Sequence, residues 1–202
     1  MSNRRPLLNL PNLLTIFRIL LVPLLVVILL TKPRFAWQEF VGLGVFLLAS
    51  LTDFLDGYLA RRNRQVTKLG QLLDPAADKI LTAAALISLV ELDGGNGRPL
   101  APAWMVAAMI AREFAVSALR SFAASEGQVI PASWSGKVKT TTQIVAISFL
   151  LIYDALGEFR HLAPILLWIA LVTTILSGVE YFVRYGHLVY RTETPPGERP
   201  QG

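Results

Sequence analysis

Long apolar segments separated by short polar ones dominate the pattern along this chain. Each of the six segments approaches or exceeds the roughly 20 residues that a helix needs to cross the hydrocarbon of a bilayer. The pattern therefore predicts an all-α fold, a polytopic membrane protein with six transmembrane helices. The expected helices are Leu13–Leu30, Ala36–Arg61, Gly70–Glu91, Leu100–Ala124, Thr140–Tyr153 and Leu162–Tyr185. The fifth reaches spanning length only if it begins near Gly136.

The two ends of the chain differ from this apolar region. Residues 1–11 mix Arg4 and Arg5 with leucines, which predicts a short juxtamembrane amphipathic segment on the lipid surface. Residues 12–190 make up the predicted six-helix membrane domain. Residues 191–202 are rich in Pro, Gly and Glu, so we expect a disordered tail there.

Composition agrees with a membrane protein and narrows the possible metal chemistry. Hydrophobic residues make up 53% of the chain and charged residues 16%, whereas a soluble domain carries roughly a quarter charged residues. There is no cysteine and only two histidines, which excludes a disulfide scaffold and a metal site rich in thiolate or imidazole. A metal ion bound by this chain would need oxygen ligands.

Charge predicts the orientation of the helices. The net charge is +5, yet only Lys32, Arg34, Arg98 and Arg160 fall in the odd-numbered connections between the predicted helices. The positive-inside rule then places both termini and the loop Arg62–Leu69 in the cytoplasm. We therefore expect a multi-pass protein of the cell (inner) membrane with a cytoplasmic active site, and no nucleic-acid partner.

Four aspartates lie inside or at the edge of the second and third predicted helices: Asp53, Asp56, Asp74 and Asp78. An ionised carboxylate near hydrocarbon costs a few kcal/mol, so the group needs a counter-charge or a cation. Spacings of three and four residues place each pair on one helix face. A short loop joins the two helices, so we expect Asp53 and Asp78 to lie level with each other, about 12 Å past the loop. Asp56 and Asp74 should lie nearly level with each other, closer to the loop. This arrangement suits one or two Mg²⁺ or Mn²⁺ ions.

Small residues beside the aspartates leave room for a bulky ligand. Gly57 and Ala60 lie within a turn of Asp56, and Gly70 lies one turn before Asp74. Arg61 can bind a diphosphate bidentately. Two other interpretations stay open: a salt-bridge network between the aspartates and nearby basic residues, and a cation transporter or proton pathway.

The complete pattern is Asp53-x-x-Asp56-Gly57-x-x-Ala60-Arg61, then eight residues, then Gly70-x-x-x-Asp74-x-x-x-Asp78. It resembles the signature of the CDP-alcohol phosphotransferases. That resemblance implies a six-helix integral membrane enzyme, usually a homodimer. It also implies transfer of a phosphoalcohol from a CDP-linked donor to an acceptor hydroxyl, with release of CMP. The resemblance extends from about Asn9 to Tyr185.

Flanking segments resemble the bacterial members of this family that use CDP-diacylglycerol and glycerol 3-phosphate. These segments are Asn9–Arg18, Leu73–Lys79, Ala111–Arg120 and Ser133–Thr140. The resemblance implies that the products are phosphatidylglycerophosphate and CMP, in phospholipid biosynthesis. Phosphatidylglycerol, inositol phosphate and serine stay open as acceptors, the first as in a CMP-forming cardiolipin synthase.

The resemblance also implies roles for single residues. Asp53, Asp56 and Asp74 would bind one metal ion, and Asp53, Asp74 and Asp78 would approach a second. Asp78 would be the catalytic general base for the attacking hydroxyl.

The expected substrate sites use residues of several helices. The CDP-diacylglycerol site would contain Gly57, Ala60, Arg61, Gly70, Asn12, Thr15 and Arg18. The glycerol-phosphate site would contain Arg112, Arg120, Lys137 and Lys139. Alternatives remain for the basic residues. Arg18 could extend to lipid headgroups, the others could only set topology or attract anionic lipid, and Glu113 could simply pair with Arg112.

Overall fold

The structure is a computed structural model that describes residues 10–32, 37–63, 68–94, 97–131 and 133–187. Side chains of residues 10–12, 53–75 and 78 are outside the described part. The described residues form six α-helices and no strand, which confirms the predicted all-α class. Their bounds are α1 Leu10–Leu30, α2 Gln38–Asn63, α3 Lys68–Glu91, α4 Ala103–Ser125, α5 Trp134–Leu151 and α6 Leu162–Tyr185, with the 3₁₀ segment η1 Asp154–His161 before α6. The predicted segment 1–11 and tail 191–202 lie almost wholly outside these residues and stay predictions.

Helix α5 begins at Trp134, six residues before the predicted start at Thr140. Ser133 precedes the helix in an extended conformation, and its Oγ accepts a hydrogen bond of 3.0 Å from the backbone N–H of Gly136. A serine at this position satisfies a backbone N–H that has no partner within the helix. The earlier start brings Lys137 and Lys139 into the first turns of α5.

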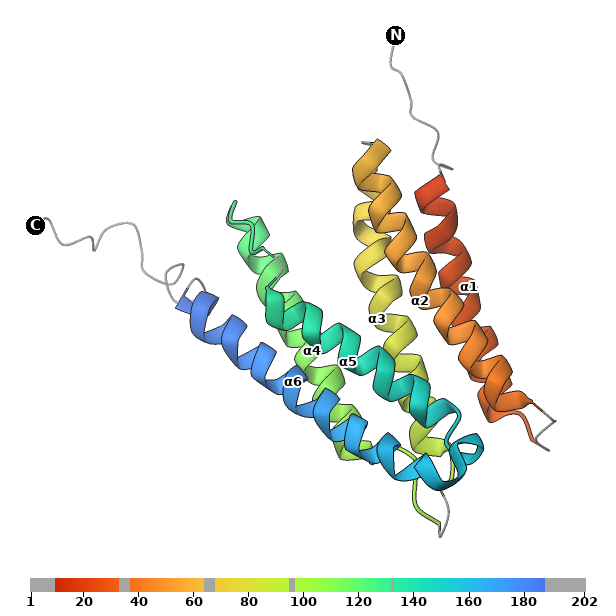
Figure 1. Cartoon of the computed structure of the whole chain (residues 1–202). Helices are drawn as coiled ribbons and strands as arrows, with labels where there is room; N and C mark the ends of the chain where they lie inside the picture. Colours follow the sequence, from red (N-terminus) through yellow and green to blue (C-terminus); the bar gives the residue numbers. More distant parts are fainter. Residues whose placement is uncertain (1–9, 33–36, 64–67, 95–96, 132, 188–202) are drawn as a thin grey trace, which may run out of the picture.

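The helices form two groups of three that pack together (Figure 1). Helix α1 contacts α2 and α3, while α6 contacts α4 and α5. Contacts of α3 with α4 and α5, and of α2 with α5, join the groups. The apolar core lies at these contacts and includes the buried side chains of Leu25, Phe46, Leu86, Met109 and Ile147.

Consecutive helices are antiparallel, so the bundle has two ends of different composition (Figure 1). At one end α1, α3 and α5 begin and α2, α4 and α6 end; we call it the site end. Toward this end α4, α5 and α6 tilt away from α1, α2 and α3 (Figure 1). The 3₁₀ segment η1 lies at the opposite end. The sequence predicted only a turn at Gly157 there, and Gly157 adopts a positive φ of 55° inside η1.

In the part of the chain that the structure describes, two segments are long and apolar enough to cross a membrane: Leu13–Leu30, and Asp154–Tyr185, which contains η1 and α6. A shorter apolar stretch covers Gln38–Thr52 of α2. Helix α6 also exposes large apolar side chains on its outer face, including Leu176 and Val183. A face of this kind is suited to contact with lipid or another protein.

Candidate functional site

The predicted site residues lie in the half of the bundle next to the site end, except Arg112, which lies near the middle of α4. Residues 12–18 lie in the first turns of α1. Asp53 and Asp56 lie in the second half of α2, and Asp74 and Asp78 in the first half of α3. Lys137 and Lys139 lie in the first turns of α5, near Ser177 on α6. Arg112 and Arg120 lie on α4, so the predicted site residues come from five helices, α1 to α5.

The backbone of the α2–α3 hairpin agrees with the predicted depths of the four aspartates. Asp53 lies ten residues before the end of α2 at Asn63, and Asp78 lies ten residues after the start of α3 at Lys68. Helices α2 and α3 are antiparallel and in contact. The side chains of all four aspartates are outside the described part, as are those of Ala60, Arg61 and Asn12 and the surroundings of Gly57 and Gly70. The roles of these residues stay predictions. Among the side chains that are described, no group of three or more His, Cys, Asp and Glu could hold a metal ion.

Thr15 and Arg18 on α1 are completely buried. A guanidinium group that extends to lipid headgroups must reach the surface of the protein, so burial argues against that alternative for Arg18. A buried positive charge instead requires polar or anionic partners inside the bundle. The position of Arg18 is consistent with the predicted binding of an anionic substrate group.

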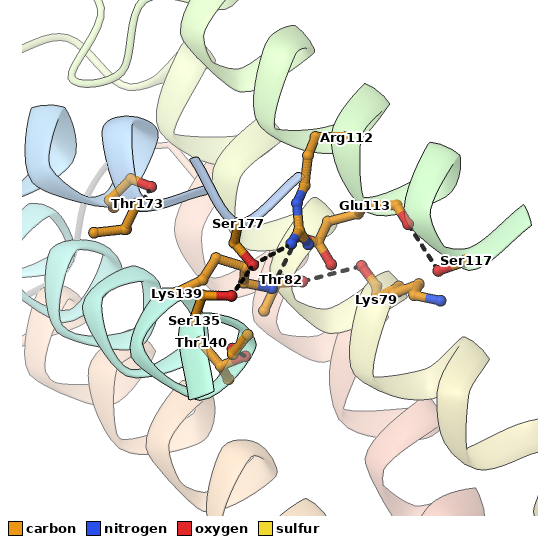
Figure 2. A network of polar contacts seen from close by, with 12 residues as sticks. Lys79, Thr82, Arg112, Glu113, Ser117, Ser135, Lys139, Thr140, Thr173 and Ser177 are labelled. Carbon is orange, nitrogen blue, oxygen red and sulfur yellow. Dashed lines mark hydrogen bonds and ion pairs between the residues drawn. The ribbon is translucent and has the colours of Figure 1, made fainter. Parts of the chain in front are cut away.

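Side chains of α4, α5 and α6 form a compact polar network where these helices meet (Figure 2). Arg112 Nη1 and Lys139 Nζ both donate hydrogen bonds to Oε1 of Glu113, over 3.0 and 2.8 Å. Arg112 Nη2 donates to Ser177 Oγ on α6 over 2.7 Å. Ser177 Oγ lies 3.2 Å from Ser135 Oγ on α5. The three charged side chains are 9–14% exposed, so the protein shields these ion pairs from water.

A second group of contacts fixes the start of α5 against α6. The backbone N–H of Ser133 donates to the hydroxyl of Tyr181 over 3.0 Å, and that hydroxyl donates to the carbonyl of Pro131 over 3.3 Å. Ser133 Oγ lies 2.9 Å from Ser135 Oγ, which connects these contacts to the network. These contacts therefore fix α5 and α6 relative to each other beside the network.

A glycine on α6 makes room for Arg112. A Cβ atom at Gly178 would lie 2.9 Å from Arg112 Cγ and 3.3 Å from its Nε. The methylene stem of Arg112 therefore packs directly against the backbone of α6.

We expect Gly178→Ala to displace Arg112 and to destabilise the protein. Overpacking a tight site costs about 1–3 kcal/mol, which should lower the midpoint of thermal unfolding of the purified protein. Gly44→Ala is the matched control, because a Cβ at Gly44 would meet no atom within 4 Å. Equal melting temperatures for the two variants would contradict the close contact.

The four residues predicted to bind glycerol phosphate differ in their exposure and in their contacts. Arg112 and Lys139 are brought together on Glu113. Arg120 is exposed at the end of α4, where its Nη2 donates to the carbonyl of Ile130 over 3.4 Å. Lys137 is exposed on the first turn of α5. The four residues therefore form a largely shielded pair and an exposed pair, and their role in binding stays a prediction. Ser177 and Ser135, which the sequence did not single out, join the contacts of Arg112.

Comparison with known proteins agrees with the family resemblance. Residues 8–176 match the CDP-alcohol phosphatidyltransferase family. The chain is 43% identical over 188 residues to a protein of Bacillus subtilis (strain 168) named CDP-diacylglycerol–glycerol-3-phosphate 3-phosphatidyltransferase, with 86% of this chain and 93% of that protein covered.

Proteins of the same name from two other bacteria are also similar. The one from Salmonella choleraesuis (strain SC-B67) is 41% identical over 180 residues, covering 86% of this chain and 92% of the relative. The one from Rickettsia felis (strain ATCC VR-1525 / URRWXCal2) is 38% identical over 177 residues, covering 86% and 93%. With a family match over most of its length and relatives at this level of identity, the chain belongs to the CDP-alcohol phosphatidyltransferase family.

Proposed function

We propose that this chain transfers the phosphatidyl group of CDP-diacylglycerol to glycerol 3-phosphate, which gives phosphatidylglycerophosphate and CMP. The observation that carries the proposal is 38–43% identity, over most of both chains, to relatives named for that reaction. The signature aspartates on the contacting helices α2 and α3 support a shared chemistry.

The carboxylates of helices α2 and α3 are suitable ligands for one or two hard divalent cations. Asp53 and Asp78 lie at one distance along the helices from the connection, and Asp56 and Asp74 lie closer to it at nearly matched distances. Their carboxylates offer only oxygen ligands. We propose Asp53, Asp56 and Asp74 as ligands of one Mg²⁺ or Mn²⁺ ion, and Asp53, Asp74 and Asp78 as ligands of a second. Such ions would neutralise the diphosphate and the oxygen that leaves with CMP.

The reaction replaces a phosphoanhydride bond of the donor with a phosphoester bond to the acceptor. The acceptor hydroxyl attacks the phosphorus that bears diacylglycerol, and the bond from that phosphorus to the CMP oxygen breaks. Asp78 accepts the proton of the attacking hydroxyl as general base. Gly57, Ala60 and Gly70 leave space for the nucleotide, with Asn12 and Thr15 beside it. Arg61 and Arg18 bind the diphosphate.

The acceptor phosphate would bind the cations of α4 and α5. Buried Arg112 and Lys139 would hold it so that the hydroxyl lies in line with the donor phosphorus. Exposed Arg120 and Lys137 would attract the dianion from the cytoplasm. Because charge-assisted hydrogen bonds strengthen as water is excluded, the buried pair should contribute more to binding than the exposed pair.

We expect Lys137→Ala and Arg120→Ala to raise the KM for glycerol 3-phosphate. A lost charged hydrogen bond is worth about 1.5–3 kcal/mol, or about ten- to a hundredfold, and exposure should place these two variants at the low end. The KM for CDP-diacylglycerol should stay nearly constant. Measuring both KM values in neutral detergent decides this, since equal shifts for donor and acceptor would contradict an acceptor role.

We further propose that all six helices span the cell (inner) membrane with the site end in the cytoplasm, and that the enzyme is a homodimer. The apolar segments Leu13–Leu30 and Asp154–Tyr185 and the exposed apolar face of α6 support the membrane location. The distribution of basic residues supports the orientation. The homodimer follows from the family resemblance.

Transfer of label tests the proposed reaction directly. Purified protein in detergent would receive ¹⁴C-labelled glycerol 3-phosphate with and without CDP-diacylglycerol. We expect label to enter the lipid extract only when CDP-diacylglycerol is present, as a lipid with two phosphate groups. Absence of lipid-borne label from fully folded protein would contradict the proposal.

A further inference from the structure

We propose that Glu113 is a positioning residue for the acceptor phosphate, acting through Lys139 and Arg112. The inference rests on the proposed function, because it assigns a role within the glycerol 3-phosphate site. Glu113 lies on α4, whereas Lys139 lies on α5 (Figure 2). Glu113 therefore connects two helices that both contribute cations.

The geometry shows how one carboxylate fixes two cations. Arg112 Nη1 and Lys139 Nζ donate to the same atom, Oε1 of Glu113, over 3.0 and 2.8 Å. Because both nitrogens bind the same oxygen atom, they are held next to each other. Neighbouring oxygens of one phosphate group can then bind both cations at once.

Lys139 depends on Glu113 more than Arg112 does. Arg112 is also held by Ser177, through a 2.7 Å hydrogen bond, and by the close approach of Gly178. For Lys139 Nζ, Glu113 is the only hydrogen-bond partner among the described residues. A lysine stem has four rotatable carbons and a compact charge, so without this contact Lys139 would lose its defined position.

The cluster of Arg112, Lys139 and Glu113 can bind an anion although it contains a carboxylate. The three side chains are 9–14% exposed and consist of two cations and one anion. Two like charges side by side repel strongly away from water, and Glu113 offsets that repulsion. One positive charge remains in excess, and Arg112 Nε is buried without a hydrogen-bond partner among the described residues. Both features favour an anionic ligand with several acceptor oxygens.

The carboxylate of Glu113 would itself repel a phosphate dianion, so its contribution is the placement of the cations. We expect Glu113→Gln to raise the KM for glycerol 3-phosphate about tenfold, comparable to the loss of one charge-assisted hydrogen bond. The KM for CDP-diacylglycerol should not change. Glu113→Asp keeps the charge on a shorter stem and should restore part of the acceptor affinity, which a merely steric role would not produce.

Glu126→Gln is the matched control, since Glu126 is an exposed residue at the C-terminal end of the same helix. It should leave both KM values at the wild-type level. The Glu113→Gln/Lys139→Met double variant tests whether Glu113 acts through Lys139. If it does, the increase in acceptor KM for the double variant will be smaller than the product of the two single increases.

Three results would overturn the inference: an unchanged or lower acceptor KM in Glu113→Gln, equal shifts for donor and acceptor, or independent effects in the double variant. If Glu113→Gln does not fold, Glu113→Asp and the Lys139→Met background carry the same comparison. Wild-type protein that forms no lipid from glycerol 3-phosphate would refute the proposed function instead. The two failures are therefore distinguishable.

Discussion

Asp78→Asn should abolish turnover while binding of CDP-diacylglycerol largely survives. Asparagine has nearly the size of aspartate, but it cannot accept the proton of the attacking hydroxyl and is a poorer ligand for a divalent cation. Loss of a positioned general base typically lowers the rate by about 10²–10⁴-fold. CMP release would be measured together with retention of radiolabelled CDP-diacylglycerol in detergent micelles.

Asp154→Asn provides the control for Asp78→Asn. Asp154 lies at the start of η1, at the end of the bundle opposite the site. This variant should release CMP at the wild-type rate. If Asp78→Asn kept more than about a third of the wild-type rate, Asp78 would have no role as the base.

Removal of divalent cations should stop the reaction completely. The chain has no cysteine and only two histidines, so the proposed ligands are carboxylate oxygens, which favour Mg²⁺ or Mn²⁺. We expect EDTA to eliminate CMP release and an excess of either ion to restore it. Undiminished activity in excess chelator, after dialysis to remove bound ions, would contradict a metal role for the four aspartates.

The pattern of apolar segments was sufficient to predict the class and the order of the helices. The sixth helix has the predicted bounds, Leu162–Tyr185, and the third ends at Glu91 as predicted. The fourth begins at Ala103 instead of Leu100 because Pro102 precedes it in an extended conformation. The fifth differs most, since the hydroxyl of Ser133 supports two further turns that hydropathy alone does not indicate.

Hydropathy was less informative about which helices cross a membrane. Among the described residues, only the segments Leu13–Leu30 and Asp154–Tyr185 are both long and apolar enough to cross a membrane. Helix α2 is apolar only over Gln38–Thr52, and the aspartates follow directly. A helix that carries polar residues at one end has a shorter apolar stretch, so the proposed six spans need not all be long and wholly apolar.

Candidate residues were predictable where their spacing is local. Residues three or four positions apart lie on the same face of a helix. The sequence alone therefore pairs Asp53 with Asp56 on one helix and Asp74 with Asp78 on the next. The contacts of Glu113 with Lys139 and of Arg112 with Ser177 join residues 26 and 65 positions apart. No periodicity in the sequence encodes such pairs. They depend on how α4, α5 and α6 pack, which is why Ser177 was missed.

The central claim is most directly tested by CMP release from CDP-diacylglycerol with glycerol 3-phosphate, phosphatidylglycerol, inositol phosphate and serine supplied in parallel. We expect stoichiometric CMP with glycerol 3-phosphate and only background with the other three acceptors. Release with a different acceptor would keep the family chemistry but refute the proposed acceptor. No CMP with any acceptor would contradict the enzymatic account and favour the alternative of a cation transporter.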